Sequence, residues 1–167
     1  MDFLRQFFNT VLYVQLSPRR LVVRDPRSRA CFDEVPEVAI HRPAGGRATV
    51  CAVGAEARAQ AAGSDVVVVN PLAHPRTLVS DFIVAEQLLK FAIRRLYGGR
   101  AVFRPSPEIV MHPVDDYEGG LTPVEIRALQ ELALGAGASR ARVWQGPALS
   151  DDELLLRRYP PAGRMLA

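Results

Sequence analysis

The sequence predicts an α/β domain in which a mixed, five-stranded sheet is flanked by helices. Short β-like runs divided by a proline turn open the chain, and later β-like runs alternate with clearly delimited helices. An opening hairpin makes antiparallel strands, whereas helical crossovers make parallel ones. The 167 residues, 49% of them hydrophobic and 23% charged, suffice for one compact domain with its own core.

The first half of the chain is dominated by strand-like segments. Four short runs are rich in β-forming residues: 11–16, 20–24, 35–40 and 49–53. Ser17-Pro18 separates the first two, and because proline has no N–H for a ladder, we expect a hairpin there. Residues 55–62 read AEARAQAA, a helix-forming composition that ends at Gly63. The valine-rich residues 65–70 predict a buried or tightly packed extended segment, because the run is too short for a helix.

The second half alternates helix and strand, and capping residues mark its helices. Residues 81–97 carry an apolar stripe at helical spacing and are followed by two glycines. A strand is expected at 108–112. Thr122-Pro123-Val124-Glu125 combines an N-cap, a first-turn proline and a capping-box glutamate. After a strand at 140–144, Ser150 to Glu153 supply a second capping box.

We expect three regions: an amphipathic N-terminal segment (1–9), the α/β domain (10–159) and a flexible tail (160–167). A helix over the first segment would gather four apolar side chains on one face: Phe3, Leu4, Phe7 and Phe8. Two roles stay open for this face. It can contact a membrane surface, or it can cover the domain's own core.

Composition excludes several classes of protein. Cys31 and Cys51 lack CxxC spacing and a histidine set, so we expect free, half-buried thiols rather than disulfides or a zinc site. No apolar run approaches the roughly 20 residues that span a bilayer, and the start lacks a secretory layout. A cytoplasmic protein is expected, with the inner face of the membrane as an alternative position. The net charge of +3 is almost wholly arginine, with Lys90 the only lysine, so nucleic acid is disfavoured as a partner.

Four stretches of sequence carry a resemblance to a known family. They contain FDEVPEVAIHR (32–42), VGAEARAQAAG (53–63), VNPLAHPRTLVSDFIVAEQLLKFAI (69–93), and FRPSPEIVMHPV (103–114) followed by TPVEIRALQELALGAGASRARV (122–143). In this order they resemble the N-terminal subdomain of the MreB family, bacterial actin homologues that determine rod shape. RPSP and GAGA are the most specific features. The resemblance covers about residues 10–147 and implies a ribonuclease-H-like, actin-like ATPase subdomain.

The departures from the family concern its nucleotide site. Where the family has Asp-Leu-Gly-Thr, the aligned residues include Gln15, Ser17 and Pro18, which supply neither a charge for magnesium nor a complete phosphate cradle. Where the family has a water-positioning glutamate, this chain has Gln145. The resemblance therefore implies a degenerate nucleotide site with no catalytic residue. We expect neither ATP hydrolysis nor a cofactor.

Other candidate sites are weaker. His112, Asp115, Asp116 and Glu118 could be read as a metal cluster, but a strand end followed by an acidic surface turn is the favoured interpretation, and no metal is expected. A ribonuclease-H-type nuclease would need a carboxylate in the first strand, and residues 10–16 contain none.

Three functional hypotheses follow. The first is a non-catalytic protein that binds MreB filaments or other shape machinery. The second is a nucleotide-binding actin-like ATPase completed by dimerisation. The third is an orphan actin-fold protein whose structure persists without a role in cell shape.

Overall fold

The computed structural model describes residues 10–61, 65–98, 105–115 and 119–167. Its main sheet has six strands in the order β3-β2-β1-β7-β8-β9. Their bounds are β1 Val11–Leu16, β2 Leu21–Arg24, β3 Cys31–Glu34, β7 Glu108–Pro113, β8 Arg140–Gln145 and β9 Arg164–Met165. The first three strands form antiparallel pairs, β1, β7 and β8 run parallel, and β9 is antiparallel to β8.

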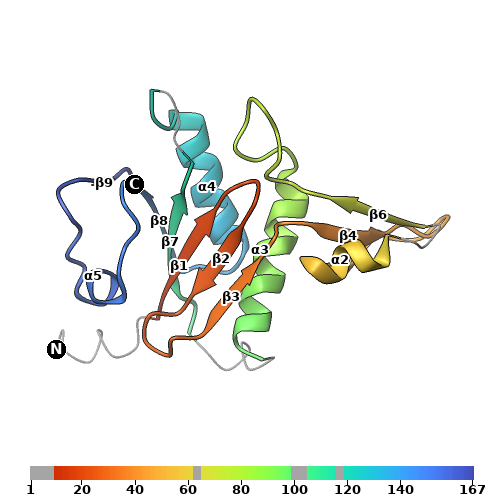
Figure 1. Ribbon diagram of the computed structural model, residues 1–167, viewed down its shortest axis with the longest axis horizontal. Coiled ribbons are helices and arrows are strands. Elements are labelled where there is room, and N and C mark those ends of the chain that lie inside the picture. The colour runs from red at the N-terminus through yellow and green to blue at the C-terminus, as the bar shows by residue number, and fades with distance from the viewer. Residues whose placement is uncertain (1–9, 62–64, 99–104, 116–118) are drawn as a thin grey trace.

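A second, smaller sheet stands beside the main one (Figure 1). It contains β4 (Val38–His41), β5 (Thr49–Val53) and β6 (Val66–Val69) in the antiparallel order β5-β4-β6. Helix α2 (Ala55–Gln60) packs on this sheet through Ala57. The other face of the small sheet joins the main hydrophobic core through Val38.

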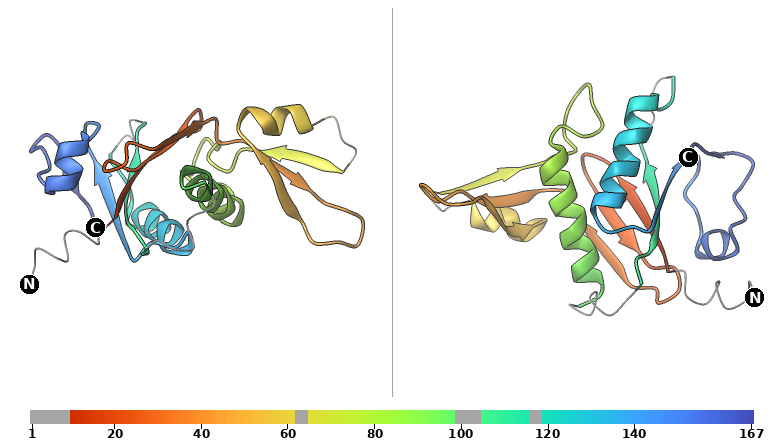
Figure 2. Two further views of the ribbon diagram at one scale, coloured as in Figure 1. Left: turned by 90° about the horizontal axis from the view of Figure 1, so that it is seen from below. Right: turned by 180° about the vertical axis from the view of Figure 1, so that it is seen from behind.

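The two faces of the main sheet have different covers, as Figure 2 shows. Helices α3 (Phe82–Leu96) and α4 (Pro123–Gly135) lie on one face, and the short α5 (Asp151–Leu156) lies on the other. Alternation along β1 explains this division, because successive side chains of a strand point to opposite faces. Leu12 and Val14 enter the core beneath α3 and α4, whereas Tyr13 enters the cluster beneath α5.

The helices begin where their capping residues predict. Asp81 caps α3 by accepting a hydrogen bond from the backbone N–H of Val84. Thr122 with Glu125, and Ser150 with Glu153, form complete capping boxes at the starts of α4 and α5. No helix in the described ranges has both the length and the apolarity needed to cross a bilayer.

The predicted mixed sheet flanked by helices is confirmed, but it has six strands rather than five, and a separate three-stranded sheet accompanies it. β3 was not expected, and the strand predicted over 35–40 begins only at Val38. The N–H of Glu37 donates to the carbonyl of Val35 (2.8 Å), forming a turn around Pro36 where the chain leaves the main sheet. The valine run at 65–70 is an edge strand rather than a buried one, and 48% of Val67 is exposed.

Two further expectations differ from the structure. Residues 164–165, within the tail expected to be flexible, form β9 and pair with Trp144 and Gln145. Cys31 and Cys51 are free, as expected, but exposed rather than half-buried. Residues 1–9, with Phe3, Leu4, Phe7 and Phe8, lie outside the described residues.

Candidate functional site

The four residues of the predicted degenerate nucleotide site lie at one end of the main sheet, where its parallel strands finish. The carboxyl ends of β1, β7 and β8 meet there because these strands are parallel. Gln15 pairs with His112 on β7, while Gln145 ends β8, the strand on the far side of β7. By strand alternation, Gln15 shares the face of Tyr13, whereas Gln145 shares that of Val143. The two glutamines therefore lie at the same end of the sheet but on opposite faces.

The turn after β1 satisfies its own polar groups. The hydroxyl of Ser17 accepts hydrogen bonds from the backbone N–H groups of Arg19 (3.3 Å) and Arg20 (3.1 Å). The carbonyl of Pro18 accepts a hydrogen bond from the side-chain amide of Asn70 (2.8 Å). A phosphate-binding loop needs N–H groups that point at the ligand. In this turn those of Arg19 and Arg20 point at Ser17 instead.

A hollow of about 410 Å³ lies at the ends of β7 and β8. Among the residues that line it are His112, Asp115, Leu121 and Gln145. A second hollow of about 550 Å³, also lined by Gln145, continues toward Arg164, whose Nη2 lies 3.4 Å from the Oε1 of Gln145. In the described ranges, Gln15, Ser17 and Pro18 line neither hollow, and no three His, Cys, Asp or Glu side chains are grouped to hold a metal.

A buried hydrogen-bond chain, unexpected from the sequence, begins beside this hollow. The Nε2 of His112 donates to the carbonyl of Gly146 (2.9 Å), which can only accept. In a neutral ring Nδ1 then accepts, and the hydroxyl of Tyr13 donates to it (2.5 Å). The same hydroxyl accepts from the N–H of Leu149 (3.1 Å). Burial lowers the pKa of His112 and raises that of Tyr13.

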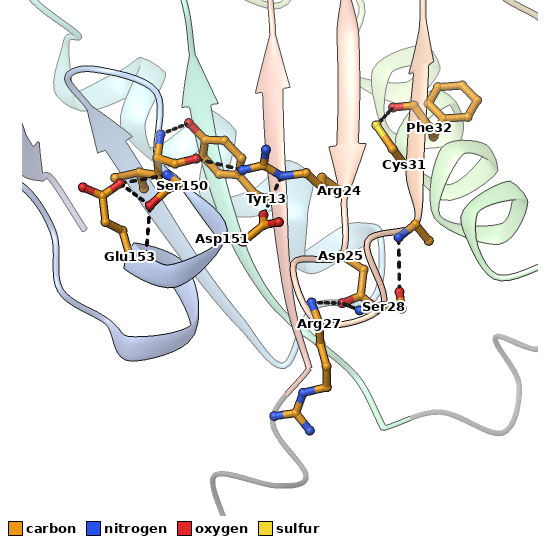
Figure 3. A network of polar contacts seen from close by, with 12 residues as sticks. Tyr13, Arg24, Asp25, Arg27, Ser28, Cys31, Phe32, Ser150, Asp151 and Glu153 are labelled. Atoms are coloured by element: carbon orange, nitrogen blue, oxygen red, sulfur yellow. Dashed lines mark hydrogen bonds and ion pairs between the residues drawn. The ribbon is translucent and has the colours of Figure 1, made fainter.

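Arg24 extends this chain toward α5 (Figure 3). Its Nη2 donates to the carbonyl of Leu149 (2.8 Å), and its Nε lies 3.1 Å from Oδ1 of Asp151. Its guanidinium carbon lies 5.3 Å from the centre of the Tyr13 ring, within cation–π range. Side chains from β1 and β2 thus hold the residues that open α5.

Glu108 makes a second polar attachment on the same face. Its side chain is 5% exposed and bonds Arg142 on β8 (2.6 Å) and Arg157 after α5 (2.5 Å). A buried carboxylate is tolerated when it is paired on both oxygens. Here each oxygen has its own guanidinium, so the charge is compensated.

The indole of Trp144 completes the attachment. Its ring centre lies 5.6 Å from that of Tyr159, and its Nε1 donates to the carbonyl of Pro147 (2.8 Å). Gly163 packs so tightly against the indole that a Cβ at this position would collide with it. Residues 147–167, here termed the C-terminal strap, therefore lie across the sheet face and end on its edge.

Little in the sequence signalled this network. Tyr13, Glu108 and His112 are polar residues within otherwise apolar strands, which is the available signal. Their partners are far away along the chain, so spacing alone could not reveal them. The sequence suggested two roles for His112, a metal ligand or a strand end before an acidic surface turn, and neither predicts that it is only 3% exposed.

Comparison with known proteins settles the family. The model of the MreB/Mbl protein family matches residues 19–150, most of the chain. The chain belongs to this family. The match begins just after Gln15, Ser17 and Pro18 and includes Gln145. The interpretation of all four as altered nucleotide-site positions stays a prediction.

Characterised MreB proteins are similar over most of this chain. The cell shape-determining protein MreB of Haemophilus influenzae is 29% identical over 147 residues, which cover 86% of this chain and 40% of that protein. MreB of Escherichia coli K12 is also 29% identical, with the same coverage. The chain thus spans about 40% of the length of these relatives.

Solved MreB structures share the fold. MreB5 of Spiroplasma citri bound to ADP superposes with a TM-score of 0.62 at 17% identity, covering 81% of this chain and 37% of that one. Its complex with AMPPNP gives a TM-score of 0.60 at 16% identity. The predicted actin-like α/β fold is confirmed. Most of the C-terminal strap lies beyond the family match, which ends at Ser150.

Proposed function

We propose that this MreB-family protein is non-catalytic and acts by binding other proteins of the cell-shape machinery, with MreB filaments as the first candidate. The observation that carries the proposal is the turn after β1, where Ser17 binds the N–H groups of Arg19 and Arg20. These N–H groups are then not free to bind a phosphate. Gln15 supplies no negative charge for a magnesium ion.

The second observation that supports the proposal is the C-terminal strap, which covers one face of the main sheet. The C-terminal strap packs on the α5 face through Tyr13, Arg24 and Glu108. The residues that match MreB of Haemophilus influenzae cover 40% of that protein, so this part of the fold would offer a filament the corresponding part of a protomer's surface. Such a role places the protein in the cytoplasm, at the inner face of the membrane wherever its filaments lie.

Co-sedimentation with purified MreB filaments tests the proposal. We expect the protein to pellet with filaments at micromolar concentration and to stay in the supernatant with unpolymerised MreB. Eukaryotic actin filaments serve as the control for non-specific sedimentation with a filament. Absence from the MreB pellet would contradict the proposed partner and favour a role outside cell shape.

A second candidate function is nucleotide binding completed by dimerisation. The hollow of about 410 Å³ beside Asp115 and Gln145 favours it, because one carboxylate and one amide remain at the ends of β7 and β8. Calorimetry with Mg-ATP separates the two functions. We expect no heat of binding, and a measurable affinity would overturn the non-catalytic proposal.

A further inference from the structure

The outer edge of β6 differs from the other sheet edges of the molecule. β6 ends the order β5-β4-β6, so no strand of the described chain pairs with its outer side. An edge strand presents a row of N–H and C=O groups that can template pairing with another chain. Proteins usually blunt such edges by keeping the edge strand short, by charges, prolines or bulges, or by covering the edge.

Each of the other edges has one of these protections. The pairing of β5 with β4 contains a register shift next to Ala39 and Ile40. β3 carries Asp33, which is ion-paired with Arg20 (2.6 Å). The last residues of β8 are covered by β9.

β6 is short, but it carries no charge, no proline and no bulge. Its four residues, Val66–Val69, are all valine, and its pairing with β4 runs without a register shift. Val66 and Val68 pack on the α2 side of the small sheet, and Val69 packs on the main core. Val67 points away from α2 and is 48% exposed. The strand is therefore uncharged, regular and apolar on a face that is partly open to solvent.

We propose that β6 pairs with β6 of a second copy in antiparallel register, so that two three-stranded sheets become one six-stranded sheet. With Val67 opposite its own copy across a two-fold axis, both exposed side chains lie on the same face. Directly opposite residues in an antiparallel pair are about 4.5–5.5 Å apart between Cα atoms. The two Val67 side chains therefore cover each other.

The charge of Asp65 favours the antiparallel orientation over a parallel one. Asp65 precedes β6 and is the nearest carboxylate along the chain. In the antiparallel register it lies opposite Val69 of the second copy, so the two Asp65 residues are four positions apart, about 13 Å. This separation exceeds the Debye length of about 8 Å at physiological ionic strength. A parallel, in-register pair would place the two carboxylates side by side, which is unfavourable.

A second copy also fits better than an unrelated strand. The partner strand must be uncharged, β-branched and free of an acidic residue opposite Asp65. β6 itself meets all three conditions. Because only four residues pair on each side, the association is weak and depends on concentration.

Sedimentation equilibrium of the full chain tests the proposal. We expect the mass to rise from 18.4 kDa toward twice that value as concentration increases. Val67→Lys should remain monomeric, because it places two ammonium groups opposite each other. The matched control is Val124→Lys on α4, where the valine is 78% exposed, and this variant should associate like the unmodified protein. A wild type that is monomeric at its highest soluble concentration, or a Val67→Lys variant that still dimerises, would overturn the proposal.

Hydrogen exchange on the unmodified protein provides a test that needs no variant. The outward-facing amides of residues 66–69 should gain protection as concentration rises. Concentration-dependent protection confined to α3 or α4 would indicate another interface and would overturn pairing through β6. Circular dichroism of Val67→Lys verifies that its loss of association is not loss of fold.

Discussion

His112 is buried, and its two ring nitrogens have different hydrogen-bond partners. Nε2 donates to the carbonyl of Gly146, so a neutral ring leaves Nδ1 to accept from Tyr13. Protonation of Nδ1 would turn that acceptor into a donor. Burial opposes the same protonation and lowers the pKa of His112 below its ordinary value.

The protein should therefore lose stability on mild acidification. Below the unfolded-state pKa of about 6.5, the unfolded chain binds a proton at His112 that the folded protein does not. The free energy of unfolding should fall by at most about 1.4 kcal/mol per pH unit, until the pH reaches the lowered folded-state pKa. Urea unfolding between about pH 7.5 and about pH 5 measures this slope.

Histidine variants isolate the source of the slope. His112→Gln should flatten it, because the titrating group is gone. His74→Gln, at an exposed loop position, should leave it unchanged. A stability that does not vary with pH in the unmodified protein would contradict the assignment of His112 as a buried neutral base.

Gly163 should tolerate no side chain. An added Cβ would collide with the indole of Trp144 and would lie 2.9 Å from the carbonyl oxygen of Gln145. We expect Gly163→Ala to destabilise the fold by about 1–3 kcal/mol, the usual cost of overpacking. It should also speed proteolysis within residues 147–167, which limited trypsin digestion reports.

Gly45→Ala is the matched control for Gly163→Ala. Gly45 has a φ of +76° and nothing within 4 Å of the added Cβ, so its substitution introduces backbone strain without a collision. We expect a cost of about 1 kcal/mol with unchanged proteolysis of the strap. Equal proteolysis of the two variants would show that the contact with Trp144 does not hold the strap.

At the scale of elements, Glu108 connects β7, β8 and the residue that ends α5. Glu108→Gln keeps the side-chain shape but leaves Arg142 and Arg157 without their shared carboxylate. The Arg142 and Arg157 side chains are 22% and 39% exposed, so water partly solvates the charges left behind and the cost should be about 1–3 kcal/mol. We expect a loss of this order in chemical denaturation, with faster hydrogen exchange in α5.

An exposed ion pair provides the comparison. Glu131 pairs with Arg127 along α4, and the side chains are 45% and 74% exposed, respectively. Glu131→Gln should change stability by less than about 1 kcal/mol. Equal effects of Glu108→Gln and Glu131→Gln would mean that the attachment of the strap does not depend on the buried charge.

The elements that sequence predicted well are those defined by local contacts. The capping boxes of α4 and α5 join residues only three positions apart, so Thr122 and Ser150 could be recognised directly. β9 could not, because two residues without apolar alternation pair with a strand about twenty positions earlier. The break at Pro36 was missed because the flanking valines continue a strand-like composition.

The candidate site shows the same contrast. The resemblance aligned Gln15, Ser17, Pro18 and Gln145 with the family's nucleotide site, and in the structure they lie at the carboxyl ends of β1 and β8. It did not indicate that Ser17 closes its own turn, which depends on how the backbone folds over the hydroxyl. The bond between Tyr13 and His112 joins residues 99 positions apart and is a product of the parallel pairing of β1 with β7.

At the scale of the whole molecule, the two sheets share one hydrophobic core. Val38, Ile40 and Val53 of the small sheet belong to the same buried cluster as Leu88 and Leu129 beneath the main sheet. Unfolding the small sheet would expose part of that cluster, so both sheets should unfold together.

Two probes test this cooperativity. Trp144, the only tryptophan, reports on the main sheet by fluorescence, while far-ultraviolet circular dichroism reports on all elements. We expect coincident denaturation curves with one midpoint. An early circular dichroism transition without a fluorescence change would show that the small sheet unfolds by itself.

The two exposed thiols have a practical consequence. Cys31 lies on β3 of the main sheet and Cys51 on β5 of the small one, and the chain contains no other cysteine. Spin labels attached to the natural sequence would therefore place one reporter on each sheet. Electron–electron distance measurements could then follow any rotation between the sheets when the protein meets a filament, with no residue replaced.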